Sequence, residues 1–104
     1  MMPWILLFLA GLFEIAWAVG LKFTEGFTRL WPTVGTVAAL AISVALLGLA
    51  SKSLPIGTAY AVWTGIGTAG TVLCGVLFFG EPATAIRLAC VALILLGVAG
   101  LKAI

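Results

Sequence analysis

Four long apolar runs, separated by short polar connections, constrain this chain more than any other feature. Each run begins close to one of the four prolines, which are Pro3, Pro32, Pro55 and Pro82. Proline suits the first turn of a helix, because its missing N–H would have no partner there in any case. The spacing therefore predicts four helices, over residues 3–21, 32–50, 55–79 and 82–102.

The runs are long enough to cross a lipid bilayer as helices. At about 1.5 Å per residue, residues 3–21 extend about 28 Å, close to the roughly 30 Å of a hydrocarbon core. Hydrophobic residues make up 64% of the chain and charged residues 8%, which is too little charge to cover a water-soluble surface. The runs are continuous rather than alternating, unlike those of a membrane β-barrel. We predict one all-α integral membrane domain, residues 1–104, with both termini on one face.

The positive charges are almost evenly divided between the two ends of such a bundle. Lys52 and Lys102 lie at the end that carries the termini. Lys22, Arg29 and Arg87 lie at the opposite end. Because positive charge near the helix ends normally sets orientation, the balance predicts that copies insert both ways up and pair as an antiparallel homodimer. A single, weakly biased orientation is the alternative.

One glutamate lies inside an apolar run. Glu14 is about three helical turns beyond Pro3, and so close to the middle of the membrane. A carboxylate at that depth costs a few kcal/mol, and desolvation favours its neutral form. Such a carboxyl group can hold a proton or a cation in turn, which is the chemistry of proton-coupled exchange. The alternative is a structural glutamate that forms hydrogen bonds within a helix bundle.

Four polar or aromatic residues are predicted at a similar depth, and they are Trp17, Ser43, Tyr60 and Trp63. Trp17 follows Glu14 by three positions and so shares its helix face. Deep indole and phenol groups need hydrogen-bond partners, and a carboxylate can supply them. A carboxylate beside aromatic faces predicts a cation site, and a planar guanidinium would match its in-plane acceptors. Plain aromatic packing between helices is the alternative.

Glycines in the third and fourth runs have a different interpretation. The stretch "GIGTAG" at 65–70 matches the letters of a dinucleotide-binding motif, but it lies within an apolar helix with no preceding strand. We interpret Gly65 and Gly67 as a hinge that lets this helix change shape. We interpret Gly97 and Gly100 as sites where helices, including those of a dimer, pack closely.

The composition also argues against several classes of protein. The net charge of +2 is too small and too dispersed for a nucleic-acid partner. The chain has no histidine, and its two cysteines lack metal-like spacing, so we expect no metal, no cofactor and no enzymatic activity. We expect no cleaved signal peptide, because "MMPWILLFLAGLFE" lacks a basic region.

Two stretches are specific in combination with Glu14. They are "KFTEGFTRLWP" at 22–32 and "LPIGTAYAVWTGIG" at 54–67. With them the chain resembles the small multidrug resistance family of bacterial transporters over essentially its whole length. It is most similar to the guanidinium exporter subtype, because "EIAW" carries Trp17 where the family's quaternary ammonium exporters tend to have a small residue. The stretch "GLK" at 100–102 also resembles that subtype.

The resemblance implies a function and roles for residues. It implies an antiparallel homodimer in the bacterial inner membrane that exchanges protons, as the coupling ion, for small organic cations. Glu14 would be the shared proton and substrate site, with Trp17 and Ser43 holding its rotamer. Tyr60 and Trp63 would form aromatic walls and a gate, and the two glycines of "GIG" would be the hinge.

We therefore expect a proton-coupled antiporter that exports guanidinium and small guanidinyl cations. An alternative within the family is a polyspecific exporter of hydrophobic quaternary ammonium compounds. Alternatives from other classes are a non-transporting membrane subunit that packs against a larger partner, and a channel. Pairing with a paralogue is the alternative to the homodimer.

Overall fold

The computed structural model describes residues 2–104, and every regular element among them is an α-helix. The helices are α1 (Met2–Thr24), α2 (Leu30–Ala50), α3 (Ile56–Phe78) and α4 (Ala85–Ala103). All four are long and apolar enough to cross a membrane. The prediction of four membrane-spanning helices is confirmed.

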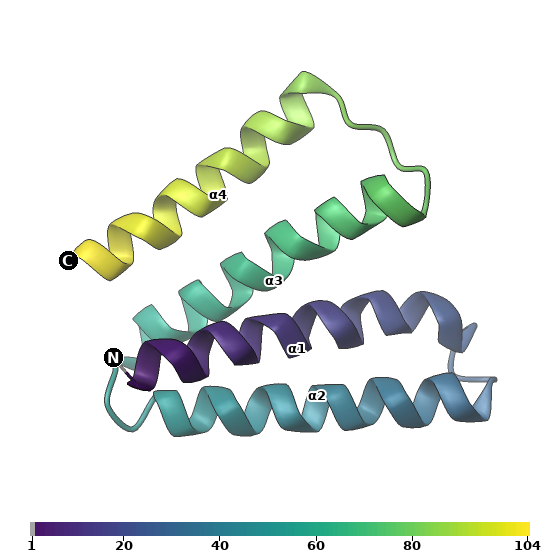
Figure 1. The fold of residues 1–104 in the computed structure, drawn as a ribbon, viewed down its shortest axis with the longest axis horizontal. Coiled ribbons are helices and arrows are strands. Elements are labelled where there is room, and N and C mark those ends of the chain that lie inside the picture. The colour runs from purple at the N-terminus through teal and green to yellow at the C-terminus, as the bar shows by residue number, and fades with distance from the viewer. Residues whose placement is uncertain (1) are drawn as a thin grey trace.

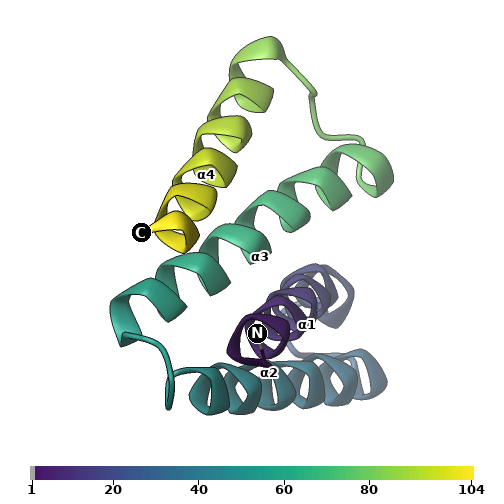
Figure 2. The same cartoon turned by 60° about the vertical axis from the view of Figure 1, so that its left-hand side comes forward.

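The helices lie side by side in the order α2, α1, α3, α4 (Figure 1). Helix α1 packs against both α2 and α3, whereas α4 packs only against α3 among the described helices. The two ends of the chain lie at the same end of the bundle, as predicted (Figure 1). Figure 2 shows that α4 diverges from α1 and α2, so much of its surface is uncovered. No residue of α4 is fully buried in this single chain.

A small core forms where α1, α2 and α3 meet. Its buried members are Leu7, Ala10, Leu47, Ala50, Ala59, Val62 and Trp63. Most other large apolar side chains are exposed in the single chain. Lipid tails are about as apolar as leucine, so this exposure carries no penalty of the kind that water would impose. Packing between helices then depends on close contact at small residues and on hydrogen bonds.

Helix α1 is longer than predicted, so its expected end at residue 21 is wrong. The chain leaves the helix only where the backbone turns left-handed, at Glu25 (φ 49°), Gly26 (φ 71°) and Phe27 (φ 69°). Glycine adopts this conformation without strain, and Gly26 lies at the centre of the turn. The Thr24 carbonyl accepts the N–H of Thr28 at 2.9 Å, which satisfies one of the last helical acceptors.

Helix α4 begins later than predicted, at Ala85 rather than at Pro82. Thr84 precedes the helix, and its hydroxyl accepts the N–H of Arg87 at 3.2 Å. A threonine at this position satisfies a helical N–H that has no other partner, whereas proline only removes one. The threonine therefore determines the start of α4. The other three helices begin within two residues of their predicted starts.

Candidate functional site

Glu14 lies near the middle of α1, and its carboxyl group packs against the backbone of α3 at Gly67. A Cβ atom at position 67 would overlap the Cδ and Oε2 atoms of Glu14. Glycine is therefore what lets the carboxyl group approach α3 so closely. The sequence pattern indicated a hinge at Gly67 and missed this contact, because it joins residues far apart in the chain.

The Glu14 carboxyl group has no neutralising partner among residues 2–104. Its Oε2 atom is buried and makes no hydrogen bond there, and the same holds for the indole Nε1 of Trp17. Within the same residues, Arg87 pairs with Glu81 and no cation pairs with Glu14. Glu14 is half-buried, and a charge on its unpartnered Oε2 atom is unfavourable, so a proton or a bound cation would stabilise this carboxyl group.

Glu14 and Trp17 line one pocket between α1 and α3, as their spacing on one helix face predicts. The other residues that line it are Ala18, Gly67, Thr68, Thr71 and Val72. Sequence reasoning missed the two threonines. Their signal was present, because Thr71 lies about one helical turn beyond both Gly67 and Thr68.

A buried chain of hydrogen bonds joins the three core helices. The indole Nε1 of Trp63 on α3 donates to the hydroxyl of Ser43 on α2 at 2.9 Å. That hydroxyl donates in turn to the Ala10 carbonyl on α1 at 2.6 Å. In an α-helix the carbonyl of residue 10 also accepts the N–H of residue 14, so this series of hydrogen bonds ends on the helical turn that carries Glu14.

These hydrogen bonds correct one expectation about the aromatic residues. The indole of Trp63 was expected to find its partner in the carboxylate, but it donates to Ser43 instead. The reason is geometric, because Ser43 is fully buried between the helices while the Glu14 side chain lies against Gly67. Any effect of Ser43 on the Glu14 rotamer must therefore pass through the backbone of α1 in this structure.

Tyr60 lies apart from the Glu14 pocket. Its ring packs edge-on against Trp63, with centroids 5.4 Å apart and an interplanar angle of 61°. The residue is 56% exposed in the single chain. The structure thus forms two groups, Glu14 with Trp17, and Ser43 with Trp63 and Tyr60, which the Ala10 turn connects.

The other glycines have contrasting surroundings. Helix α3 is continuous through Gly65 and Gly67, so a hinge there stays a prediction. A Cβ atom at Gly65 would overlap Val98, so this glycine brings α4 close to α3. Around Gly97 and Gly100 a Cβ atom would meet no described atom within 4 Å. The predicted packing at these two glycines is therefore not made inside the single chain.

These features define a class: a polytopic helical membrane protein with an acidic site in the middle of its first membrane-spanning helix. The chain belongs to the small multidrug resistance family, because the family model described as "Small Multidrug Resistance protein" matches residues 2–94. Membership confirms the resemblance and, with the four helices, makes this a multi-pass protein of the bacterial inner membrane.

Curated relatives are similar over almost their whole length. The chain is 59% identical over 101 residues to the "Guanidinium exporter" of Escherichia coli (strain K12), covering 97% of this chain and 96% of the relative. It is 55% identical to the protein of the same name from Proteus vulgaris, covering 97% of each chain. The identity to that from Salmonella typhimurium is 54%, covering 97% of this chain and 96% of the relative.

Proposed function

We propose that this chain is a proton-coupled exporter of guanidinium and small guanidinyl cations. The single observation that carries the proposal is the half-buried Glu14 carboxyl group in the middle of a membrane-spanning helix, whose buried Oε2 atom lacks a partner among residues 2–104. Ionisable groups in that position are expensive and usually functional. The curated relatives are named guanidinium exporter, and this name supports the substrate class.

One carboxyl group that serves both ligands explains coupling. The deprotonated group binds the cation, and the protonated group has no charge to attract it. A proton arriving from outside the cell therefore displaces the cation there, and loss of that proton inside prepares the site for the next cation. Exchange of protons for cations follows if the protein switches between its inward-open and outward-open states only when a proton or a cation occupies the site.

The shape of the site favours a planar cation. Trp17 shares the pocket with Glu14, and its indole Nε1 has no partner among the described residues. The ring occupies space that a cation with bulky substituents on all sides would need, whereas guanidinium is flat and offers N–H donors in one plane. Carboxylate oxygens match those donors in pairs.

An antiparallel homodimer completes the proposed site. Two chains bring two Glu14 carboxylates to one cavity, which suits a cation with donors on several sides. Two observations support pairing. The cationic residues are nearly balanced between the two ends, and α4 leaves Gly97 and Gly100 without neighbours in the single chain. In such a dimer the inward-open and outward-open states have the same structure, inverted.

The remaining predicted residues then have positioning roles. Ser43 and Trp63 fix the α1 turn that carries Glu14, through the hydrogen bonds that end on Ala10. Tyr60, exposed beside Trp63, forms the wall and gate on the open side. Gly65 and Gly67 on α3 provide the hinge for the change of shape.

The test is guanidinium uptake into proteoliposomes driven by a proton gradient. Wild type is expected to accumulate guanidinium against its concentration gradient, and Glu14→Gln is expected to lose this activity. Glu25→Gln is the matched control, because it makes the same change at an exposed glutamate in the α1–α2 connection. Equal loss in both variants would contradict the role of Glu14.

The same assay separates the competing functions. Strong uptake of bulky quaternary ammonium ions without guanidinium uptake would support a polyspecific exporter. Guanidinium flux that a proton gradient cannot drive uphill would support a channel. No flux of either cation would support a non-transporting subunit.

A further inference from the structure

Two glycines on α3 each have a carboxyl group packed against them. Gly67 contacts the carboxyl group of Glu14, and a Cβ atom at Gly75 would overlap the carboxyl group of Glu81. Gly75 lies two helical turns beyond Gly67, which corresponds to about 12 Å along the helix. The mechanism proposed above uses Glu14 and leaves Glu81 without a role.

Two adjoining pockets between α1 and α3 surround the two carboxyl groups, and together we call them the groove. The Glu14 pocket shares Ala18 and Thr71 with a second pocket nearer the end of both helices. The second pocket contains Lys22 and Glu81 in its lining. The groove therefore extends from Glu14, near the middle of α1, to a mouth that Lys22 and Glu81 line near the ends of α1 and α3.

The backbone fixes Glu81 at this mouth. The N–H groups of Phe79 and Glu81 both donate to the Gly75 carbonyl, at 3.0 Å and 3.1 Å. These bonds fold the chain back over the last turn of α3 and hold the start of the loop against the helix. The position of Glu81 is thus determined by local structure as well as by its ion pair.

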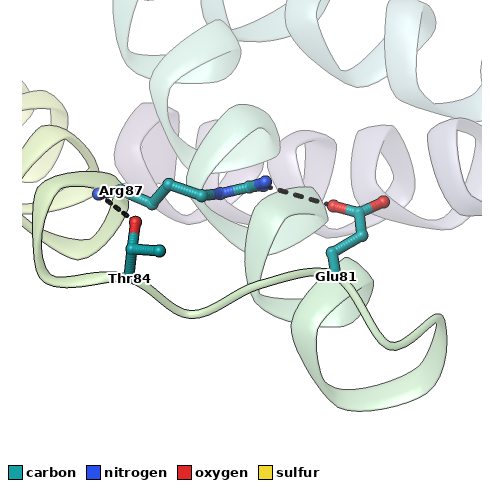
Figure 3. A network of polar contacts seen from close by, with 3 residues as sticks. All are labelled: Glu81, Thr84 and Arg87. Carbon is teal, nitrogen blue, oxygen red and sulfur yellow. Dashed lines mark hydrogen bonds and ion pairs between the residues drawn. The ribbon is translucent and has the colours of Figure 1, made fainter.

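Glu81 pairs with a guanidinium group of the protein itself. A guanidinium nitrogen of Arg87, Nη2, lies 3.3 Å from Oε1 of Glu81 (Figure 3). The two side chains are 38% and 42% exposed, so water screens this pair and makes it weak and exchangeable. A guanidinium group of the protein thus occupies the carboxylate, and Thr84 caps the turn from which it extends (Figure 3).

We propose that Glu81 is a second, weaker binding site for guanidinium compounds at the mouth of the groove, where they displace the guanidinium group of Arg87 on their way to Glu14. This inference rests on the proposed function for its substrate class. Lys22 in the same lining repels cations and, with Arg87, keeps this outer site weak. Because this outer site binds substrate weakly, it releases the substrate readily toward Glu14.

The experiment compares Glu81→Gln and Arg87→Gln in initial-rate guanidinium uptake by proteoliposomes at low ionic strength. Glu81→Gln is expected to raise KM about threefold with kcat unchanged, because it removes the attracting charge. Arg87→Gln is expected to lower KM about twofold, because it removes the competitor. Both effects are expected to disappear in about 1 M salt, where the screening length is about 3 Å. Glu25→Gln, the same change at another exposed glutamate, is expected to leave KM unchanged.

The opposite directions of the two effects distinguish this role from a structural one. Both variants delete the same ion pair, so a purely structural pair would change KM or kcat in the same direction in both. That result would overturn the proposal, and so would an unchanged KM in Glu81→Gln or an equal rise in KM in Glu25→Gln.

A binding measurement separates failure of this inference from failure of the proposed function. Line broadening of ¹⁵N-labelled guanidinium is measured with purified Glu14→Gln protein, which lacks the inner carboxylate. Salt-sensitive broadening is expected to persist in Glu14→Gln and to disappear in Glu14→Gln/Glu81→Gln. No broadening in Glu14→Gln overturns the outer site whether or not wild type transports guanidinium. If the wild type does not transport guanidinium, that result contradicts the proposed function and leaves the outer site to be decided by the binding measurement.

Discussion

The hydroxyl of Ser43 donates a 2.6 Å hydrogen bond to the Ala10 carbonyl, one helical turn before Glu14. The same hydroxyl accepts the indole N–H of Trp63, so one small side chain ties α2 and α3 to the turn of α1 that carries the acid. Hydrogen bonds between helices are among the few specific forces that hold a membrane bundle in one arrangement. The position of Glu14 therefore depends on a residue that does not touch its carboxyl group.

Replacing Ser43 should destabilise the protein and weaken substrate binding. Ser43→Ala leaves the buried indole N–H of Trp63 without its partner, which costs about 1 to 2 kcal/mol. Unfolding of the purified protein in detergent measures the loss, and guanidinium uptake measures the change in KM. Ser53→Ala, at an exposed serine in the α2–α3 connection, is the control and should change neither. Equal stability of Ser43→Ala and wild type would contradict the structural role.

A methyl group at Gly67 should separate folding from function. Gly67→Ala places a Cβ atom where the Glu14 carboxyl group lies, and the flexible end of that side chain can move aside. Alanine also favours the helix by up to about 1 kcal/mol over glycine. We therefore expect a folded protein that binds guanidinium at least tenfold more weakly. Binding and thermal unfolding are measured together.

Gly57→Ala is the matched control on the same helix, because a Cβ atom there meets no described atom within 4 Å. It should retain wild-type binding with equal or greater stability. Loss of binding in Gly57→Ala as well would show that helix flexibility, rather than contact with the carboxyl group, determines the effect at position 67.

The sequence allowed the bundle and its acid to be predicted, because hydrophobic length and an isolated charge are properties of single segments. Glu14 and Trp17 also share a face on one helix, so their common pocket followed from spacing. The contact with Gly67 and the bond from Ser43 to Ala10 did not follow, because they depend on how α1 packs against two other helices.

Local chemistry explains the errors at helix ends. Proline marked the start of three runs well, but at the fourth the Thr84 hydroxyl caps the helix three residues beyond the expected start. At the end of α1, polar residues suggested a loop, whereas the backbone turns only at Glu25 to Phe27. In both places hydrogen bonding and backbone geometry, rather than hydrophobicity, determine the boundary.

Trp17 should control which cations the site accepts. Trp17→Ala removes the ring that lines the pocket beside Glu14, so we expect uptake of tetrapropylammonium, which the wild type should exclude. Guanidinium uptake should weaken, since a flat aromatic surface is lost. Trp31→Ala is the control, because this tryptophan is 78% exposed at the start of α2. Exclusion of tetrapropylammonium by Trp17→Ala would assign selectivity to other residues.

The uncovered face of α4 should be needed for pairing. Gly97→Leu and Gly100→Leu add large side chains where the single chain has open space, so the fold of one chain should be unaffected while dimers dissociate. Cross-linking in membranes and single-molecule counting in lipid measure the oligomeric state. Gly48→Leu on α2, also in open space, is the control. Dimers that survive both α4 substitutions would place the interface elsewhere.

Proton and cation should compete for Glu14, which gives substrate affinity a defined dependence on pH. When the carboxyl group is protonated it has no charge to attract guanidinium, so affinity is low in acid. As the pH rises, the carboxyl group loses its proton and guanidinium affinity increases. The increase is up to tenfold per pH unit for each carboxyl group that must be deprotonated, and affinity reaches a plateau once deprotonation is complete. Equilibrium binding of guanidinium to the purified protein, measured from about pH 5 to pH 9, tests this dependence. Glu25→Gln should show the same dependence of affinity on pH as the wild type, because Glu25 is exposed and outside the groove. Glu14→Gln should lose this dependence and most of its affinity for guanidinium. A flat affinity across this range in the wild type would mean that the two ligands do not share one carboxyl group, and coupling would then require a second acid.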